Sequence, residues 1–195
     1  DKTYAYMQDS TGEYINEQVV LFGPYQQETW QIAFDPARLD SVETVAVFQY
    51  HPIGVEIDTL PDFYLTSAFA GRMREKVRHY GNVAEAFGAM RSGEVSAVMG
   101  MRAEIDHELS KPENAQFKAA SNGFPGIGKQ VWDVGMAIKH THRQLGYALE
   151  AIVDRLVRSG EMNELMSGQQ LRYSVPGYYR DFLDEASLAR AEGRH

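Results

Sequence analysis

The sequence has 195 residues and no cysteine, which excludes structural disulfides and thiolate metal sites. This absence does not assign a cellular compartment, because cysteine-free proteins occur on both sides of a membrane. The chain also lacks an apolar run of roughly twenty residues, the length needed to cross a bilayer. Its first residues do not show the basic-then-apolar pattern of a secretion signal. We therefore expect a cytosolic protein, or a protein whose signal has been removed.

Positive charge is scarce relative to negative charge. Lys and Arg number 19 and Asp and Glu 27, which gives a formal net charge of −8 at pH 7. Nucleic-acid affinity rests on clustered Lys and Arg, so a phosphate-rich surface is not the expected partner, although local basic patches can exist. The composition of 44% hydrophobic and 24% charged residues is that of an ordinary globular protein with one or two domains.

Short apolar segments alternate with amphipathic ones along the chain. Strands are expected where apolar residues alternate or form short runs, and helices where they recur every three or four positions. This order predicts an open α/β sheet with helices on its faces. The expected strands cover residues 19–22, 30–34, 45–48, 95–99 and 117–120. The expected helices cover residues 63–79, 83–92 and 102–109, and Gly23 and Pro24 are expected to break the chain.

The most regular pattern lies between residues 131 and 168. Alternating apolar residues at 134–138 predict a strand, and Thr141 and Gln144 have the spacing of a capping box that begins a helix. Gly160 is expected to end that helix in a left-handed conformation. The apolar residues expected on its buried face are Leu145, Leu149, Ile152 and Leu156.

Several polar motifs could carry catalysis, but a structural explanation is favoured for each. Ser96 lacks the flanking glycines of a nucleophile elbow. Residues 106–108 and 140–142 contain ligand-capable side chains, yet neighbouring helical residues diverge and neither segment has the H-E-x-x-H spacing. The glycine-rich segment 122–128 has no following helix to hold a phosphate and is expected to be a loop beside a cleft. We therefore expect no enzyme activity, no catalytic residue, no cofactor and no metal site.

A binding site is expected where an apolar strand ends. Gln49, Tyr50 and His51 directly follow the run at 45–48. In open α/β sheets ligands bind beyond the carboxyl ends of strands, so these three side chains are predicted to point into a cleft. Aromatic residues make up 11% of the chain, and they suit ligand walls and interfaces as well as a core.

The order of segments from residue 42 to 173 resembles the second lobe and return segment of type II periplasmic solute-binding proteins, a family that includes polar amino-acid binders. The similarity is carried by the strand at 44–49, by Gly-Glu-Val-Ser-Ala-Val at 93–98 and by Ser-Gly-Glu-Met-Asn-Glu-Leu at 159–165. In amino-acid binders an aspartate is typical at the position of Ser96, and the carboxylate that holds the ligand's amino group falls at Met101. A buried ammonium without a partner is costly, which argues against an amino-acid ligand here.

Within this family the chain is most similar to the J proteins, MxaJ and XoxJ, that accompany quinoprotein methanol dehydrogenases. The shared segments are the turn at 23–25, the strand sequence at 132–137 and Pro-Gly-Tyr-Tyr at 176–179. The resemblance implies a periplasmic, non-enzymatic accessory protein that binds a PQQ-dependent methanol dehydrogenase and helps it to mature or to become active. Whether that dehydrogenase uses calcium or a lanthanide is left open.

The same resemblance implies a two-lobed α/β fold, with open sheets flanked by helices and an incomplete first lobe. Residues 1–40 would be the remnant of lobe 1 and the crossover, and residues 41–128 would be lobe 2. Residues 129–195 would supply the return strand and C-terminal helices that pack on lobe 1. Residues 1–24 are too short for the usual first-lobe segment, so this lobe is expected to be truncated or degenerate.

The leading hypothesis is therefore a wide cleft whose aromatic and methionine wall binds a segment of a protein partner, with no nucleic acid and no membrane insertion. The predicted partner-binding residues are Tyr25, Gln49, Tyr50, His51, Met101, Arg102 and Trp132. The alternative is a conventional receptor of an ABC transporter, in which polar groups converge on a small polar solute. The third hypothesis, that the chain is an enzyme, has the least support from the sequence.

Overall fold

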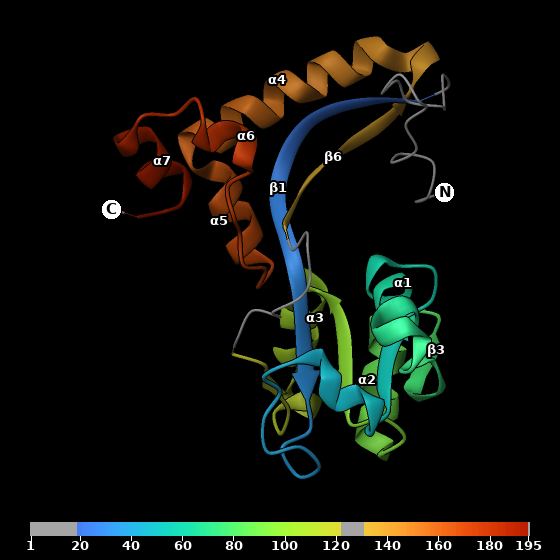
Figure 1. The fold of residues 1–195 in the computed structure, drawn as a ribbon. Helices are drawn as coiled ribbons and strands as arrows, with labels where there is room; N and C mark the ends of the chain where they lie inside the picture. Colours follow the sequence, from blue (N-terminus) through green and yellow to red (C-terminus); the bar gives the residue numbers. More distant parts are fainter. Residues whose placement is uncertain (1–18, 122–130, 195) are drawn as a thin grey trace. The chain divides into compact units, whose positions relative to one another are not determined.

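A computed structural model describes residues 19–121 and 131–194, which divide into two compact units (Figure 1). Of these residues, unit 1 comprises 19–27, 132–169 and 173–194, and unit 2 comprises 28–121, 131 and 170–172. The fold is mixed α/β with an open sheet flanked by helices, which confirms the predicted fold class. The predicted glycine-rich loop at 122–128 lies outside the described residues.

The described strands form one sheet of order β3-β2-β4-β1-β5, and β6 pairs with β1. One side of this sheet is parallel, because β2 pairs in parallel with both β3 and β4. β1 runs antiparallel to β4 and to β5. The strands are β1 (Val19–Phe34), β2 (Ile53–Glu56), β3 (Val77–Tyr80), β4 (Ala97–Met101), β5 (Lys118–Ala119) and β6 (Val131–Lys139).

The two faces of the unit 2 sheet are covered by different helices. The helices are α1 (Leu60–Ser67), α2 (Val83–Ser92) and α3 (Arg102–Leu109). Phe87 of α2 and Ile105 of α3 share one apolar cluster with Val98 of β4. Side chains alternate along a strand, so the neighbours of Val98 point to the opposite face, where α1 packs. The 102–109 helix is where the sequence predicts it.

Helix α2 lies where the sequence predicts a helix, and local groups cap both of its ends. The side chain of Asn82 accepts a hydrogen bond from the Glu85 N–H at 2.8 Å, and the Glu85 carboxylate in turn accepts from the Gly81 N–H at 3.0 Å. Gly93 ends the helix at φ 82°, a conformation that costs glycine little. Both ends of this helix are therefore fixed by local chemistry.

The strand expected at 45–48 is wrong, because these residues form a 3-10 helix, Val45–Gln49. The Thr44 hydroxyl accepts a hydrogen bond from the Ala46 N–H at 3.1 Å and so begins the turn. Val45 and Phe48 are buried whereas the residues between them are only partly buried. The apolar run thus follows a three-residue period, and the strand comes later, at β2.

The single helix expected at 63–79 is also wrong. α1 ends at Ser67, and 3-10 turns at Ala68–Gly71 and Arg74–Lys76 lead into β3. The Ser67 hydroxyl donates to the Phe63 carbonyl at 2.6 Å, a local bond that competes with the helical ladder. Phe69 and Ala70 then take positive φ values of 52° and 58°. The period-four apolar pattern therefore spans three different elements.

The chain break expected at Gly23 and Pro24 does not occur, because β1 continues through both residues. Proline cannot donate to a strand ladder and is tolerated at ribbon edges. The Gly23 N–H donates instead to a side chain, the Glu150 carboxylate, at 2.9 Å. The strands expected at 19–22 and 30–34 are therefore the two ends of one long strand.

Unit 1 packs four helices with the ribbon of β1 and β6. They are α4 (Arg143–Ser159), α5 (Glu161–Gly168), α6 (Gly177–Arg180) and α7 (Glu185–Ala191). Gly160 ends α4 at φ 87°, and Arg158 pairs with Asp154 at 2.9 Å. The predicted capping box is wrong, because the N-cap is His142 without a side-chain bond. A 3-10 turn of unit 1 lies at His140–His142, and one of unit 2 lies at Pro112–Asn114.

The buried face of α4 differs from the predicted one. Gly146, Val153 and Val157 are buried, whereas Leu145 and Ile152 are 54% and 47% exposed. The helix carries two adjacent apolar stripes, and its own unit covers only one of them. None of the helices within residues 19–121 and 131–194 has the length and apolarity to cross a bilayer.

Candidate ligand-binding site

The carboxyl ends of β2 and β4 meet at one edge of the unit 2 sheet. Both strands run in parallel, and each is followed by a helix: β2 leads to α1, and β4 leads directly to α3. Two helix amino termini therefore lie at this edge, where main-chain N–H groups lack partners within the helix. An edge of this kind is where open α/β sheets bind ligands.

The turn between β2 and α1 is held by side-chain bonds. Asp58 takes a positive φ of 59°, and its N–H donates to the buried Asp62 carboxylate at 3.0 Å. The other oxygen of Asp62 lies 2.9 Å from His79 Nε2 on β3. The Thr59 hydroxyl donates to the Glu56 carbonyl at 2.6 Å. Because both carboxylate oxygens of Asp62 have partners, the turn is fixed from α1 and from β3.

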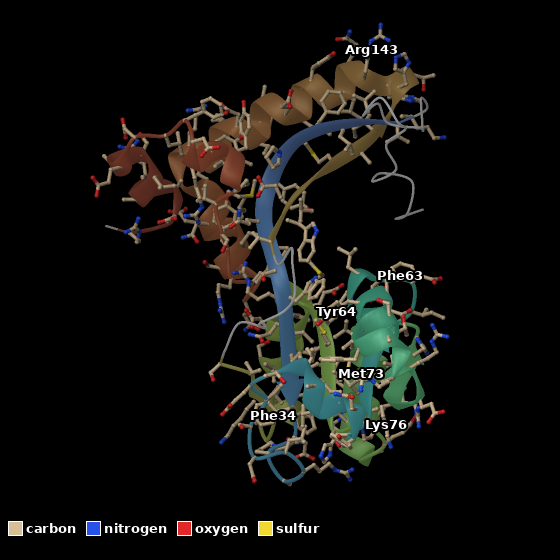
Figure 2. All side chains as sticks on the ribbon, viewed as in Figure 1. Phe34, Phe63, Tyr64, Met73, Lys76 and Arg143 are labelled. Carbon is tan, nitrogen blue, oxygen red and sulfur yellow. The ribbon has the colours of Figure 1, made fainter. Side chains whose placement is uncertain are left out.

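An aromatic and methionine wall lies at the same edge. Trp30 on β1 is the register partner of Met101 on β4, so the two side chains share a face of the sheet. The Trp30 ring lies 4.9 Å from the Tyr64 ring on α1, at an interplanar angle of 47°. Burial raises the pKa of Tyr64, so its phenol stays neutral. Figure 2 shows Tyr64 on the side of α1 toward β1, and Phe63 directed away from it.

A buried charged pair lies beside this wall. Glu28 Oε1 is 3.9 Å from Arg102 Nη2, and both side chains are almost fully buried. Glu28 Oε2 accepts a hydrogen bond from the Ala103 N–H, in the first turn of α3, at 3.3 Å. A carboxylate is favoured at a helix amino terminus. The chain therefore already supplies an anion to the start of α3, and an anionic ligand would have to compete with it.

Residues 170–172 attach to the same helix. Arg102 Nη2 donates to the Arg172 carbonyl at 3.2 Å, and the Arg172 guanidinium pairs with Asp106 at 3.2 Å. The Ser110 hydroxyl donates to Gln170 Oε1 at 3.1 Å. Arg102 thus joins the start of α3 to two segments far away in sequence, namely Glu28 and the 170–172 segment.

The structure places the sequence-predicted residues in three locations. Met101 and Arg102 lie at the carboxyl edge of β4, next to one another. Tyr25 and Trp132 belong to the β1 and β6 ribbon of unit 1. Gln49, Tyr50 and His51 precede β2, because the strand that they were expected to follow is a 3-10 helix. They therefore approach the amino end of β2, and the premise that places them at a carboxyl edge is wrong.

Sequence reasoning missed Trp30, Tyr64 and Glu28. Trp30 was expected in a strand, but its partner across the sheet depends on register, which local pattern does not reveal. Tyr64 was expected in a helix without a stated role. Glu28 lies in the middle of a strand, where a carboxylate is unusual, and this was the one local signal that could have identified it.

Among the motifs that were expected to be structural, Ser96 directly precedes β4. It is buried, and its N–H donates to the Pro52 carbonyl at 2.8 Å. Within the part of the chain that the structure describes, no group of three His, Asp or Glu side chains could hold a metal ion. The pair of Asp62 and His79 holds the turn between β2 and α1 in place.

Comparison with solved structures identifies the fold. An ancestral arginine-binding protein bound to glutamine is 20% identical with a TM-score of 0.60, over 77% of this chain and 63% of the other. The amino-acid ABC transporter substrate-binding protein AbpA from Streptococcus pneumoniae, bound to L-arginine, is 16% identical with a TM-score of 0.67, over 79% and 62%. A solute receptor for L-cysteine of Neisseria gonorrhoeae is 15% identical with a TM-score of 0.62, over 87% and 62%.

These similarities show that the chain has the type II periplasmic solute-binding fold. The chain spans about three-fifths of the length of these structures. The sequence matches no protein-family model and no curated protein. The neighbours are binding proteins, and none of those named here is a dehydrogenase accessory protein.

Proposed function

We propose that this chain is a non-enzymatic solute-binding receptor that works in the periplasm with an ABC transporter. The carboxyl edge of unit 2 is its ligand-contacting surface. The observation that carries the proposal is the wall of Trp30, Tyr64 and Met101 beside the amino termini of α1 and α3. Aromatic faces give a small solute contact area, and helix amino termini give it hydrogen-bond donors.

The charges at this edge favour a neutral ligand with an apolar or aromatic face. Glu28 already occupies the start of α3 and is paired with Arg102. The position where amino-acid binders place a carboxylate for the ligand's ammonium is Met101, so an amino group would find no matching charge there. Displacing Glu28 for a ligand carboxylate would leave a buried charge unpaired, which costs several kcal/mol (about 3–5).

Thermal-shift screening tests this proposal with defined probes. The panel contains free amino acids, neutral aromatic and aliphatic amides, and sugars. We expect a neutral solute to raise the melting temperature with increasing concentration, because ligand bound only to the native state stabilises it. Free arginine or glutamine at the same concentration should have a smaller effect. If only the charged amino acids stabilised the chain, the proposed ligand class would be wrong.

A second candidate is the dehydrogenase accessory role implied by the sequence resemblance. Met101 in place of a carboxylate favours it, as does the exposed side chain of Phe63 on α1. Both suit an apolar protein segment better than a polar metabolite. Adding the chain to a purified quinoprotein methanol dehydrogenase tests this role. A rise in turnover that Trp30→Ala removes would support it, and unchanged turnover with no complex on gel filtration would exclude it.

A further inference from the structure

A concentrated set of cations lies on a chain that is otherwise acidic. Between α1 and the end of β3, the sequence places Arg72, Arg74, Lys76 and Arg78 at alternate positions, with Glu75 as the one carboxylate among them. The chain as a whole has a net charge of −8. We call these four cations the basic strip. It follows the 3-10 turns into β3, which is an edge strand of the sheet.

The basic strip has no ion pairs among the described residues, unlike many other cations of this chain. Arg38, Arg102 and Lys111 of unit 2 each pair with a carboxylate. Two cations of the strip, Arg72 and Arg78, donate hydrogen bonds to main-chain carbonyls instead. Arg72 Nε donates to the Phe69 carbonyl at 3.0 Å, and Arg78 Nη1 to the Glu75 carbonyl at 2.7 Å. Main-chain carbonyls therefore orient Arg72 and Arg78 without neutralising their charges.

Two exposed aromatic rings belong to the elements that directly precede the basic strip. Phe63 and Phe69 are 54% and 38% exposed. The Phe69 carbonyl is the acceptor for Arg72, and Phe63 lies on α1, whose Asp62 bonds His79 of β3. In Figure 2, Phe63 and Lys76 lie toward opposite ends of this stretch of unit 2. The surface thus combines rings with guanidinium groups, a combination enriched at protein interfaces.

We propose that this surface docks a carboxylate-rich segment of a partner protein, with the rings of Phe63 and Phe69 contacting its apolar residues. Three of the four cations are arginines, whose planar guanidinium matches a carboxylate bidentately. A chain of net charge −8 is repelled by an extended anionic surface such as a bilayer. A short acidic segment engages only the local charges, because salt screens more distant ones beyond about 8 Å.

Fluorescence anisotropy tests the proposal on the full chain. The probe is a fluorescein-labelled, glutamate-rich peptide that carries phenylalanine, and the control peptide has glutamine in place of glutamate. We expect Arg74→Glu/Arg78→Glu to weaken binding of the acidic peptide about tenfold or more. The matched control is Lys139→Glu/Arg143→Glu, the same charge change on exposed residues of unit 1, which should leave the affinity within about twofold.

The aromatic contribution has its own control. Phe63→Ala should weaken peptide binding several-fold, whereas Phe182→Ala, at a highly exposed ring of unit 1, should not. Circular dichroism melts check that each variant stays folded, and Arg74→Gln/Arg78→Gln repeats the test without charge reversal. An equal loss in both charge-reversal variants would overturn the proposal. So would binding to phosphatidylglycerol vesicles, but not to the peptide, that Arg74→Glu/Arg78→Glu removes.

This inference does not depend on the solute proposed above. Solute stabilisation in thermal-shift assays should persist in Arg74→Glu/Arg78→Glu, because the basic strip lies outside the wall of Trp30, Tyr64 and Met101. Failure of peptide docking with intact solute binding would reject the docking surface alone. The reverse result would reject the solute site alone.

Discussion

Single polar side chains fix the local geometry of unit 2 by satisfying specific partners. Tyr80, at the end of β3, donates its hydroxyl proton to Glu94 Oε1 at 2.9 Å. Burial, and then the hydrogen bond and charge of Glu94, raise the pKa of Tyr80 to about 12. The phenol is therefore kept neutral in the folded chain over a range in which an unfolded tyrosine begins to ionise.

This pKa shift predicts a difference between Tyr80→Phe and wild type that depends on pH. A pKa raised on folding contributes stability that is complete below the unfolded value, near 10, and is lost as the pH rises toward about 12. Tyr80→Phe should lower the free energy of unfolding by about 1 kcal/mol at neutral pH. The deficit should shrink between pH 10 and 12, as urea denaturation can measure. Tyr50→Phe is the control, and a deficit independent of pH would contradict the assignment.

Prediction from sequence was least complete at the level of single site residues. Met101 and Arg102 were predicted as partner-binding residues through the resemblance to solute-binding proteins, and that role stays a prediction. Trp30 and Tyr64 meet only because β1 pairs with β4 in one register and α1 packs on that face. The partners of a residue across a sheet are set by tertiary packing, which neither periodicity nor spacing encodes.

At the scale of elements, close backbone approaches decide where helices pack. A Cβ at Gly146 of α4 would overlap the Phe22 ring on β1, whereas a Cβ at Gly168 of α5 would meet nothing within 4 Å. Gly146 is therefore the point at which α4 rests on the ribbon of unit 1. Helix propensity alone would favour alanine at both positions.

Alanine at these two glycines should have opposite effects. Gly146→Ala should destabilise the chain by about 1–3 kcal/mol, because overpacking outweighs the gain in helix propensity. Gly168→Ala should be neutral or stabilising by up to about 1 kcal/mol. Thermal unfolding of the two variants side by side measures the contrast. Equal stability of both variants would mean that α4 does not rest on Phe22.

The amino-terminal cap of α2 gives a second test at this scale. Asn82→Ala removes the acceptor of the Glu85 N–H and should cost about 1 kcal/mol. Asn82→Ser retains a capping oxygen and should recover most of that loss. Urea denaturation with an unchanged m-value is the measurement. If Asn82→Ser were as unstable as Asn82→Ala, the loss of stability would not come from the capping oxygen.

Elements with local signals were predicted well, and elements that depend on context were not. The helices α2 and α4 were predicted because a glycine follows an apolar period, although the capping box expected for α4 is wrong. The helix α3 was predicted as a short helix after a strand. The prediction for residues 45–48 was wrong because a short apolar run fits a 3-10 turn as well as a strand. The prediction for residues 63–79 was wrong because α1 ends at Ser67 and two 3-10 turns follow it. The prediction of the buried face of α4 was wrong for another reason. Periodicity shows that residues share a face of a helix, but it does not show whether other elements cover that face.

At the scale of the whole molecule, the fold is that of type II solute-binding proteins, although sequence identity to the named structures is 20% or less. The alternation of strands and helices predicted an open α/β sheet, and the resemblance of residues 42–173 to solute-binding proteins predicted the type II fold. A shared fold does not fix the ligand, and we propose that side chains at the edge of one sheet select it in this chain. The basic strip is likewise a property of side chains and independent of the fold.

The most direct test of the proposed site uses Trp30 as its own reporter. The chain has two tryptophans, so Trp132→Phe leaves Trp30 as the sole indole fluorophore. Titration with the stabilising solute from the thermal-shift panel should change Trp30 emission saturably. Tyr64→Ala should weaken that binding about tenfold, which corresponds to roughly 1.4 kcal/mol, whereas Tyr50→Ala should not. Saturable binding by calorimetry with unchanged Trp30 emission, and with equal affinity in Tyr64→Ala, would place the ligand elsewhere and contradict the proposed site.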